Sequence, residues 1–263
     1  MLTLLHHNIS VCAQKVRLAL YEKGLAWEGR EIDLMKQEHL TPDFLRINSK
    51  GLVPVLLHDG TPICESTVIL EYLEDVFPDT PLRPASALGK ARMRTWTKIP
   101  DEGLHTACAS VTYASAFVHQ LRSGHDKQEW EARLRKLPDR ARAARQGLIL
   151  EQEFEAPFVK DAVLLHDKVL REMNIALESQ PWLAGDEFTL ADIAIVPYVT
   201  RLDRLGLEGM WATLPKVGSW LERVQARPSF DLAITAFASN SYDDELKKHG
   251  IDVWPQVAAL LEA

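Results

Sequence analysis

The sequence predicts two domains, a small α/β domain over residues 1–80 and an all-helical domain over residues 87–263. Three observations predict this division. Apolar strands alternate with a helix at the start of the chain, a proline-rich stretch follows at about residues 78 to 86, and only helical periodicity continues beyond it. A chain of 263 residues is long for one globular domain and comfortable for two.

The first domain opens with a strand, a helix and a second strand. "LTLLHH" is a short apolar run, and "QKVRLALYEKG" repeats Val16, Ala19 and Leu20 at helical spacing before Gly24 ends the helix. "WEGREIDL" alternates as a strand does. This order predicts a right-handed crossover between two parallel strands.

A hairpin is expected next, in "LVPVLLHDGTPIC". Two apolar runs flank Asp59 and Gly60, a pair typical of a two-residue turn. Pro54 lies just inside the first run and lacks an N–H, so it should mark the start of the strand. The sequence does not decide whether the Val53–Pro54 bond is cis or trans.

A helix should open at Glu65 and Ser66. The stripe at i, i+3, i+4 and i+7 that should pack it on the sheet consists of Ile69, Tyr72, Leu73 and Val76.

The second domain has one clear helix start. In "GDEFTLADIAIVPYVTRL", Thr189 is the expected N-cap, Asp192 occupies the reciprocal position of a capping box, and Phe188 can pack on Ile193. In the long segment from residue 87 to about 121, Pro100 should bend the helix.

Charge and cysteine content indicate which partners and which cellular compartment to expect. The net charge of −7 disfavours nucleic acid as a partner, and the basic stretch at 139–146 has acidic neighbours, so it is interpreted as a solvated helix face. Cys12, Cys64 and Cys108 form no disulfide framework, which favours a reducing compartment. No signal peptide or membrane span is evident, so we expect a cytoplasmic protein with no membrane partner.

The start of the third helix offers a binding site. Its free N–H groups and the Ser66 hydroxyl suit a carboxylate, and Glu65 beside them suits an ammonium group. Together they fit the head group of an amino acid. The backbone of Val53 can pair with an extended peptide. The alternative is that Ser66 only caps a helix.

These motifs together resemble the thioredoxin-like domain of the glutathione transferases, and "FTLADIAI" resembles the capping box of that family's helical domain. The likeness spans about residues 1 to 235. It implies glutathione as cosubstrate. Glu65 and Ser66 would hold the γ-glutamyl end, Val53 beside Pro54 the cysteinyl backbone, and His39 the glycine carboxylate.

One position departs from the family pattern. Several relatives have Lys or Gln where this chain has Leu52, so that contact with glutathione is not expected. His6 and His7 point to opposite faces of a strand, and no paired Cys/His spacing occurs elsewhere, so no metal site is expected.

The resemblance also indicates the reacting group. "SVCAQKVRLAL" is similar to the Ser-x-Cys entrance of zeta-like transferases, and Ser10 falls where the family places the residue facing the glutathione sulfur. A hydroxyl that donates to a thiolate stabilises it by roughly 1.5–3 kcal/mol. Cys12 has three alternatives: a small buried filler, a helper outside direct contact, or a thiol-exchanging group.

The class of electrophile stays open. "ESTVILEYLEDVFPD" and "ARMRTWTKIPDE" resemble the bacterial β-etherase-type transferases, which cleave aryl ethers with glutathione. A pocket for a small hydrophobic acceptor is expected between the domains, with Trp96, Tyr113 and Phe117 as candidates that could equally be core. The resemblance also implies a homodimer. A glutathione-dependent cis-trans isomerase and a non-enzymatic binding module are the alternative functions.

Overall fold

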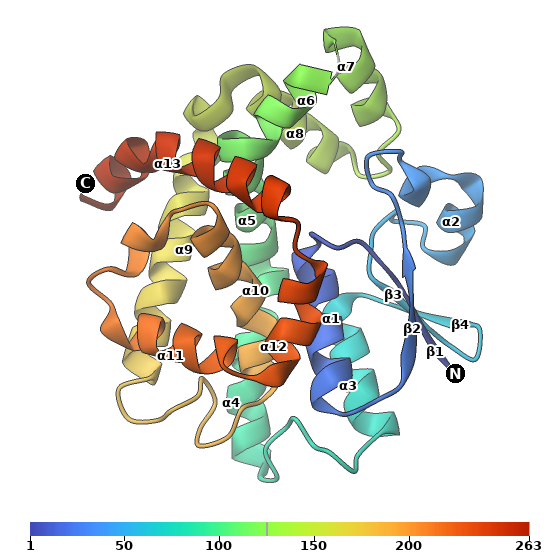
Figure 1. Ribbon diagram of the computed structural model, residues 1–263, viewed down its shortest axis with the longest axis vertical. Coiled ribbons are helices and arrows are strands. Elements are labelled where there is room, and N and C mark those ends of the chain that lie inside the picture. Colours follow the sequence, from blue (N-terminus) through green and yellow to red (C-terminus); the bar gives the residue numbers. More distant parts are fainter. Residues whose placement is uncertain (125, 263) are drawn as a thin grey trace. The chain divides into compact units, whose positions relative to one another are not determined.

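The computed structural model describes residues 1–124 and 126–262 (Figure 1). Their packing divides the chain into two compact units. The first takes in residues 1–101, 176–197 and 220–238, and the second takes in the ranges between and after these. The α/β and all-helical parts that the sequence predicts are both present. The domain boundary expected near residues 78 to 86 stays a prediction.

A four-stranded mixed sheet organises the first unit, in the order β2-β1-β3-β4 (Figure 1). Its strands are β1 Leu2–His6, β2 Trp27–Glu31, β3 Val55–His58 and β4 Thr61–Cys64. β1 and β2 are parallel, as the crossover predicts, and the other two pairings are antiparallel. β3 begins directly after Pro54, and the hairpin turns at Asp59 and Gly60, both with positive φ (47° and 81°). The two predictions for this hairpin are confirmed.

Helices connect and cover the strands. Those of the first unit are α1 Val11–Glu22, the short η1 Glu38–Leu40, α2 Pro42–Ile47, α3 Ser66–Val76, α4 Ala87–Lys98, the first half of α10 Leu190–Arg204, most of α11 Pro215–Gln225, α12 Pro228–Ala233 and η6 Thr235–Phe237. α1 is the most enclosed of them, since every residue from Ala13 to Leu20 is buried.

The buried face of α3 differs from the expected stripe. Ile69 and Leu73 are fully buried as predicted, but Val76 is 39% exposed and Leu70 is buried in its place. The apolar face therefore runs i, i+3, i+4, i+7 from Ser66, one turn earlier than expected. Tyr72 is half-buried, and its hydroxyl lies 2.7 Å from Nδ1 of His58.

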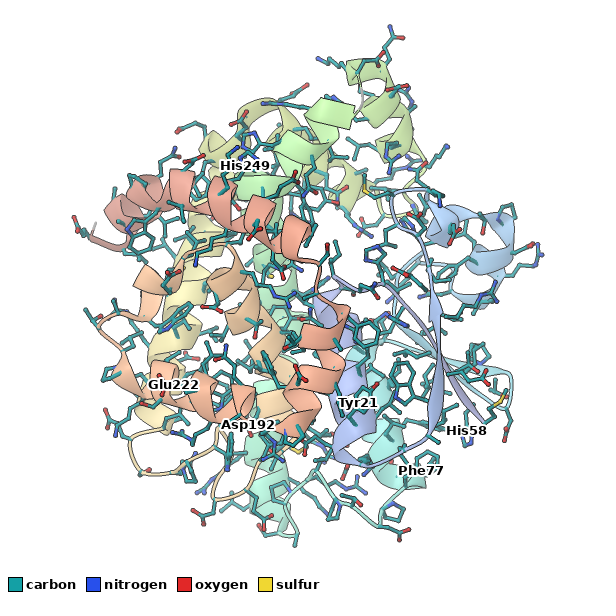
Figure 2. The ribbon with its side chains drawn as sticks, viewed as in Figure 1. Tyr21, His58, Phe77, Asp192, Glu222 and His249 are labelled. Carbon is teal, nitrogen blue, oxygen red and sulfur yellow. The ribbon has the colours of Figure 1, made fainter. Side chains whose placement is uncertain are left out.

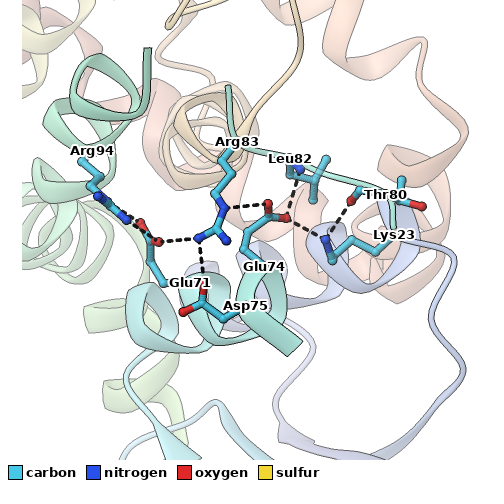
Figure 3. A network of polar contacts seen from close by, with 8 residues as sticks. All are labelled: Lys23, Glu71, Glu74, Asp75, Thr80, Leu82, Arg83 and Arg94. Atoms are coloured by element: carbon cyan, nitrogen blue, oxygen red, sulfur yellow. Dashed lines mark hydrogen bonds and ion pairs between the residues drawn. The ribbon is translucent and has the colours of Figure 1, made fainter. Parts of the chain in front are cut away.

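The proline-rich stretch at 78–86 is held firmly within the first unit (Figure 3). Lys23 donates to Glu74 at 2.7 Å and to the carbonyl of Thr80 at 2.7 Å, and Glu74 also accepts from the N–H of Leu82 at 3.0 Å. Both charged side chains are 1% exposed. Arg83 then pairs with Asp75 at 2.7 Å. A buried ion pair thus fixes the backbone of a segment whose composition suggests a loose linker.

The helix start at Thr189 is confirmed. Oγ1 of Thr189 accepts from the N–H of Ala191, and the carboxylate of Asp192 accepts from the N–H of Thr189 at 3.0 Å. Asp192 also accepts from Leu183 N–H at 3.0 Å and from the indole of Trp220 at 2.8 Å. Three donors on one fully buried carboxylate explain why this helix begins where it does.

The second unit is helical. Its elements are the π-helical turn η2 Pro100–Leu104, α5 His105–Thr112, η3 Tyr113–Phe117, α6 Val118–Gly124, α7 Lys127–Arg135, α8 Arg140–Gln152, η4 Glu153–Glu155, α9 Pro157–Ala176, the second half of α10, η5 Glu208–Trp211 and α13 Asn240–Glu262. The bend expected at Pro100 occurs within η2, where Gly103 has a φ of 141°. In the described part of the chain, no helix is long and apolar enough to cross a membrane.

Candidate functional site

The strand register brings three chain segments to one edge of the sheet. Leu5 of β1 lies opposite Val55 of β3, and Val55 lies opposite Cys64 of β4. The end of β1, the start of β3 and the end of β4 therefore lie side by side. The segments that continue from these three points are neighbours at the same edge, although they are far apart in the sequence.

Those segments carry most of the residues expected to bind glutathione. β1 leads into the loop that contains Ser10, β3 is entered through Val53 and Pro54, and β4 leads directly into Glu65 and Ser66. The sheet thus gathers a hydroxyl, an extended backbone segment and a helix start at one edge.

Ser10 is the N-cap of α1. Its Oγ accepts a hydrogen bond from the N–H of Ala13 at 3.2 Å, and its side chain is half-buried. That bond uses a lone pair of the hydroxyl, so the hydroxyl hydrogen can be donated to another atom. The position at the start of a helix also favours a negative charge nearby.

A buried arginine holds the loop that leads to Ser10. Arg17 is fully buried, and its guanidinium donates to the carbonyls of His7 and Asn8 at 3.4 and 3.0 Å. It also donates to the carbonyl of Ala233 at 2.7 Å. The sequence gives no sign of this role, because an arginine in an amphipathic helix is normally expected to face solvent.

Cys12 lies in the first turn of α1 with intermediate exposure. Its three alternative roles stay predictions. Cys64 is also partly exposed, and burial is the main cause that raises its thiol pKa. Cys108 is buried in the second unit.

The start of α3 has an unusual backbone. Glu65 is the N-cap residue at φ 68° and ψ 114°, and its side chain makes no capping hydrogen bond. A non-glycine residue in this region costs of order 1–3 kcal/mol, and such residues occur preferentially at functional sites. Ser66 is the first residue of the helix, not its cap, and it is 7% exposed. The simple capping role for Ser66 is therefore wrong.

The carboxylate of Glu65 has a partner that the sequence did not indicate. Nζ of Lys50 lies 2.7 Å from its Oε1, and the two side chains are 63% and 49% exposed. An exposed pair of this kind contributes about 0–1 kcal/mol. Glu65 raises the pKa of Lys50 through this hydrogen bond. Glu65 thus already binds an ammonium group at the place where a ligand ammonium was expected.

Val53 and His39 complete the expected set. The Val53–Pro54 bond is cis, and Val53 makes no backbone hydrogen bond to any other described residue. His39 is buried within η1. Gly51, at φ 60°, lies so close to η1 that a Cβ there would be 3.1 Å from the His39 carbonyl. This close approach keeps the loop before Val53 packed against the element that carries His39.

The candidate acceptor residues belong to different units. Trp96 is half-buried on α4 of the first unit. In the second unit, Tyr113 and Phe117 contact edge to face with ring centroids 5.1 Å apart. Tyr113 packs into a cluster of buried residues from η3, α8 and α9, and burial raises its pKa. Its packing is that of a core residue, and the pocket role of all three stays a prediction.

Within 1–124 and 126–262, no three or more His, Cys, Asp or Glu side chains come together in a way that could hold a metal ion.

Comparison with known proteins identifies the family. Residues 9–76 match the family model of the glutathione S-transferase N-terminal domain, and residues 137–228 match that of the C-terminal domain. The protein LigF of a Sphingobium strain is 33% identical over 246 residues, which cover 87% of this chain and 90% of LigF. Glutathione S-transferase 3 of Zea mays is 30% identical over 226 residues, covering 84% and 88% of the two chains.

Solved structures agree with the sequence comparison. The crystal structure of the β-etherase LigF from Sphingobium sp. strain SYK-6 superposes with a TM-score of 0.80 at 29% identity, covering 89% of this chain and 99% of that one. Glutathione transferase F7 of Populus trichocarpa gives a TM-score of 0.71 at 26% identity, covering 91% and 100%. Both the matched domains and the likeness along nearly the whole chain lead to one conclusion: this chain belongs to the glutathione S-transferase family.

Proposed function

We propose that this chain is a glutathione transferase in which Ser10 stabilises the glutathione thiolate for attack on a small hydrophobic electrophile. The observation that carries the proposal is the shared sheet edge, where the segments bearing Ser10, Val53 and Glu65 emerge side by side. One tripeptide can reach all three segments.

The γ-glutamyl group binds at the start of α3 in this proposal. Its carboxylate accepts from the N–H and hydroxyl of Ser66, where the N-cap side chain leaves the first N–H groups without a capping bond. Its ammonium group replaces Nζ of Lys50 on the carboxylate of Glu65. The backbone of Val53 pairs with the cysteinyl residue, and His39 lies toward the glycine end.

Ser10 acts on the sulfur. A thiol has an unperturbed pKa of about 8.5, so little thiolate exists at neutral pH. A hydroxyl that donates to the thiolate stabilises it by roughly 1.5–3 kcal/mol, which lowers the pKa by about one to two units. The N-terminus of α1 acts in the same direction.

An aryl ether is the electrophile we propose first, because the structurally similar LigF is a β-etherase. The thiolate attacks the carbon that bears the ether oxygen, the new C–S bond forms as the C–O bond breaks, and the phenolate leaves with the electron pair. A proton from water then neutralises the phenolate. The proton released when the thiol ionises replaces the one that water donates, so glutathione and the ether are the only reactants consumed. We place the acceptor near Trp96, Tyr113 and Phe117, and we expect a homodimer as in other family members.

A glutathione-dependent cis-trans isomerase is the second candidate. The observation in its favour is the partial exposure of Cys12, two residues after Ser10 in the first turn of α1. A binding module without activity is the third. It would be retained on immobilised glutathione but would turn over no electrophile.

The decisive experiment titrates the thiolate of bound glutathione by its ultraviolet absorbance and screens aryl ethers, aryl halides and cis-enediones. We expect Ser10→Ala to raise the thiol pKa toward about 8.5 and to slow turnover near pH 7 by on the order of tenfold. Cys12→Ser is the matched control and should change the pKa little. If Ser10→Ala is silent while Cys12→Ser is inactive, the thiol is the working group and the transferase assignment to Ser10 fails.

A further inference from the structure

A cavity in the first unit is lined by none of the residues expected to bind glutathione. It is open to solvent, has a volume of about 590 Å³, and lies between β2, the end of α1 and η6. Its main lining side chains are His6, Asn8, Tyr21, Trp27, Glu31 and Phe237. Small-molecule sites commonly have volumes of about 300–1,000 Å³ and an apolar lining with a few polar groups.

The strand register assigns this cavity to one face of the sheet. Leu2, Leu4 and His6 of β1 lie opposite Trp27, Gly29 and Glu31 of β2. Paired residues of neighbouring strands project to the same side, so the side chains of Trp27 and Glu31 stand on the side of His6. Leu5 projects to the other side and packs in the cluster with Phe44 of α2.

Aromatic rings form the walls. Trp27 meets Tyr21 edge to face with ring centroids 5.7 Å apart, and it meets His6 in the same way at 5.9 Å. Phe237 meets His6 at 5.5 Å. In Figure 2, Tyr21 lies near the end of α1. The rings of Tyr21, Trp27 and Phe237 are partly exposed, so a flat ligand can contact them, whereas His6 is buried behind them.

A glycine of β2, Gly29, lies directly under two of these rings. A Cβ on Gly29 would lie 2.9 Å from Nε2 of His6 and 3.2 Å from the Trp27 ring. Any other residue at this position would fill the space between the two rings. The two rings therefore pack directly over the backbone of Gly29, and a side chain there would displace them from the wall.

His6 is a neutral part of the wall. Nη1 of Arg17 lies 3.2 Å from Nδ1 of His6. A guanidinium can only donate, so Nδ1 is the acceptor and the neutral ring carries its proton on Nε2, which faces Gly29. Burial, Arg17 and His7 lower the pKa of His6 to about 4, so the ring is neutral at physiological pH.

Glu31 supplies the charge. Among the described residues that line the cavity, it alone is charged at neutral pH. The positive charge of Arg17 lies behind the wall, because its N–H groups bond the carbonyls of Asn8 and Ala233 and its guanidinium lies 4.1 Å from the centre of the Phe237 ring. A cation that enters the cavity would meet a carboxylate and the faces of aromatic rings, both of which attract it.

We propose that this cavity is a binding site for a small planar aromatic amine, whose ring packs between Tyr21, Trp27 and Phe237 and whose ammonium group pairs with Glu31. This site is independent of the glutathione site, and the proposal does not depend on the transferase reaction.

The test compares tryptamine with indole-3-acetate, which share one ring system and carry opposite charges. Calorimetry on the full chain should show tryptamine binding at least tenfold more tightly. Glu31→Gln should weaken tryptamine about tenfold and remove the difference between the two ligands. Glu28→Gln, on the opposite face of β2, is the matched control and should change neither affinity.

A second variant tests the cavity itself. Gly29→Val should abolish binding of both ligands while retention on immobilised glutathione is unchanged. If this variant does not fold, the result with Glu31→Gln decides alone. Equal affinities for the two ligands, no binding of tryptamine to the wild type at about 10 mM, an equal loss with Glu28→Gln, or displacement of tryptamine by glutathione would each overturn the proposal.

Discussion

Two helix starts in the first unit are built in opposite ways. At the start of α10, the carboxylate of Asp192 accepts from three donors and Thr189 closes the capping box. At the start of α3, Glu65 has a positive φ and no capping bond from its side chain. The start of α10 therefore has its hydrogen-bond partners within the chain. The start of α3 has N–H groups without a side-chain cap and a strained residue, Glu65, and a bound ligand with a carboxylate and an ammonium group would offset the free-energy cost of both.

The largest change in stability is expected at the start of α10. Asp192→Ala leaves two backbone N–H groups and the Trp220 indole without an acceptor in a fully buried place. We expect the free energy of unfolding to fall by about 3–5 kcal/mol. Denaturant unfolding measures this loss. Glutathione affinity of the folded fraction should not change, and a selective loss of affinity would show that α10 takes part in binding.

The next largest effect is a loss of glutathione affinity at the start of α3. Ser66→Ala removes a hydroxyl that we propose binds the γ-glutamyl carboxylate, so glutathione affinity should fall by about 1–3 kcal/mol. Calorimetry measures it. Ser86→Ala is the matched control, because Ser86 caps α4 with a 3.0 Å bond to Gly89 N–H. That variant should lose about 0.5–2 kcal/mol of stability and keep its affinity. Equal losses of glutathione affinity in Ser66→Ala and Ser86→Ala would contradict the proposal that Ser66 binds the ligand while Ser86 only caps a helix.

The pH dependence of stability provides a third comparison. Burial raises the pKa of Asp192 from 3.8 to about 6, although its three donors favour the charged form. The folded chain therefore takes up a proton more readily than the unfolded chain. This contribution is complete below the unfolded value and is lost as the pH rises through about 6.

Asp192→Asn isolates that contribution. The stability of the wild type relative to this variant should increase by roughly 1–1.5 kcal/mol between pH 8 and pH 5. Unfolding curves at both pH values measure the difference. A difference that stays constant, or that grows toward pH 8, would mean that the carboxylate keeps its ordinary pKa in the folded chain.

The smallest effect is a gain. Glycine accepts a positive φ without strain, so Glu65→Gly should raise the free energy of unfolding by about 1 kcal/mol, less the small contribution of the Lys50 pair. The same variant should lose retention on immobilised glutathione. Thermal unfolding and retention are measured on one preparation. A variant that is less stable and still retained would show that Glu65 serves the fold and not the ligand.

Features that depend on residues close in sequence could be predicted, and features that depend on packing could be predicted only in part. The turn at Asp59 and Gly60 and the capping box at Thr189 and Asp192 were predicted because each depends on residues that are close in sequence. The buried face of α3 was displaced by one turn, since the sheet decides which side of a helix is covered. This displacement explains why Leu70 is buried and Val76 is exposed.

Residues whose partners are distant in sequence were not predicted. Lys50 reaches Glu65, and Arg17 reaches Ala233, only because the fold brings them together. The positive φ of Glu65 is also invisible in the sequence, because glutamate rarely adopts it. The site residues taken from the family resemblance remain predictions, and the register of the sheet explains how three of their segments share one edge.

The buried ion pair of Lys23 and Glu74 has a consequence for proteolysis and for truncation of the chain. The proline-rich segment at 78–86 is what a protein engineer would choose for a protease nick or for separating the halves of a fusion. Its backbone is bonded to Lys23 and Glu74, so we expect proteases to cleave it slowly in the native protein. A fragment that ends at residue 78 would leave an ammonium and a carboxylate without the carbonyl and the N–H that they bind here. The first eighty residues should therefore be expressed together with the segment that follows them.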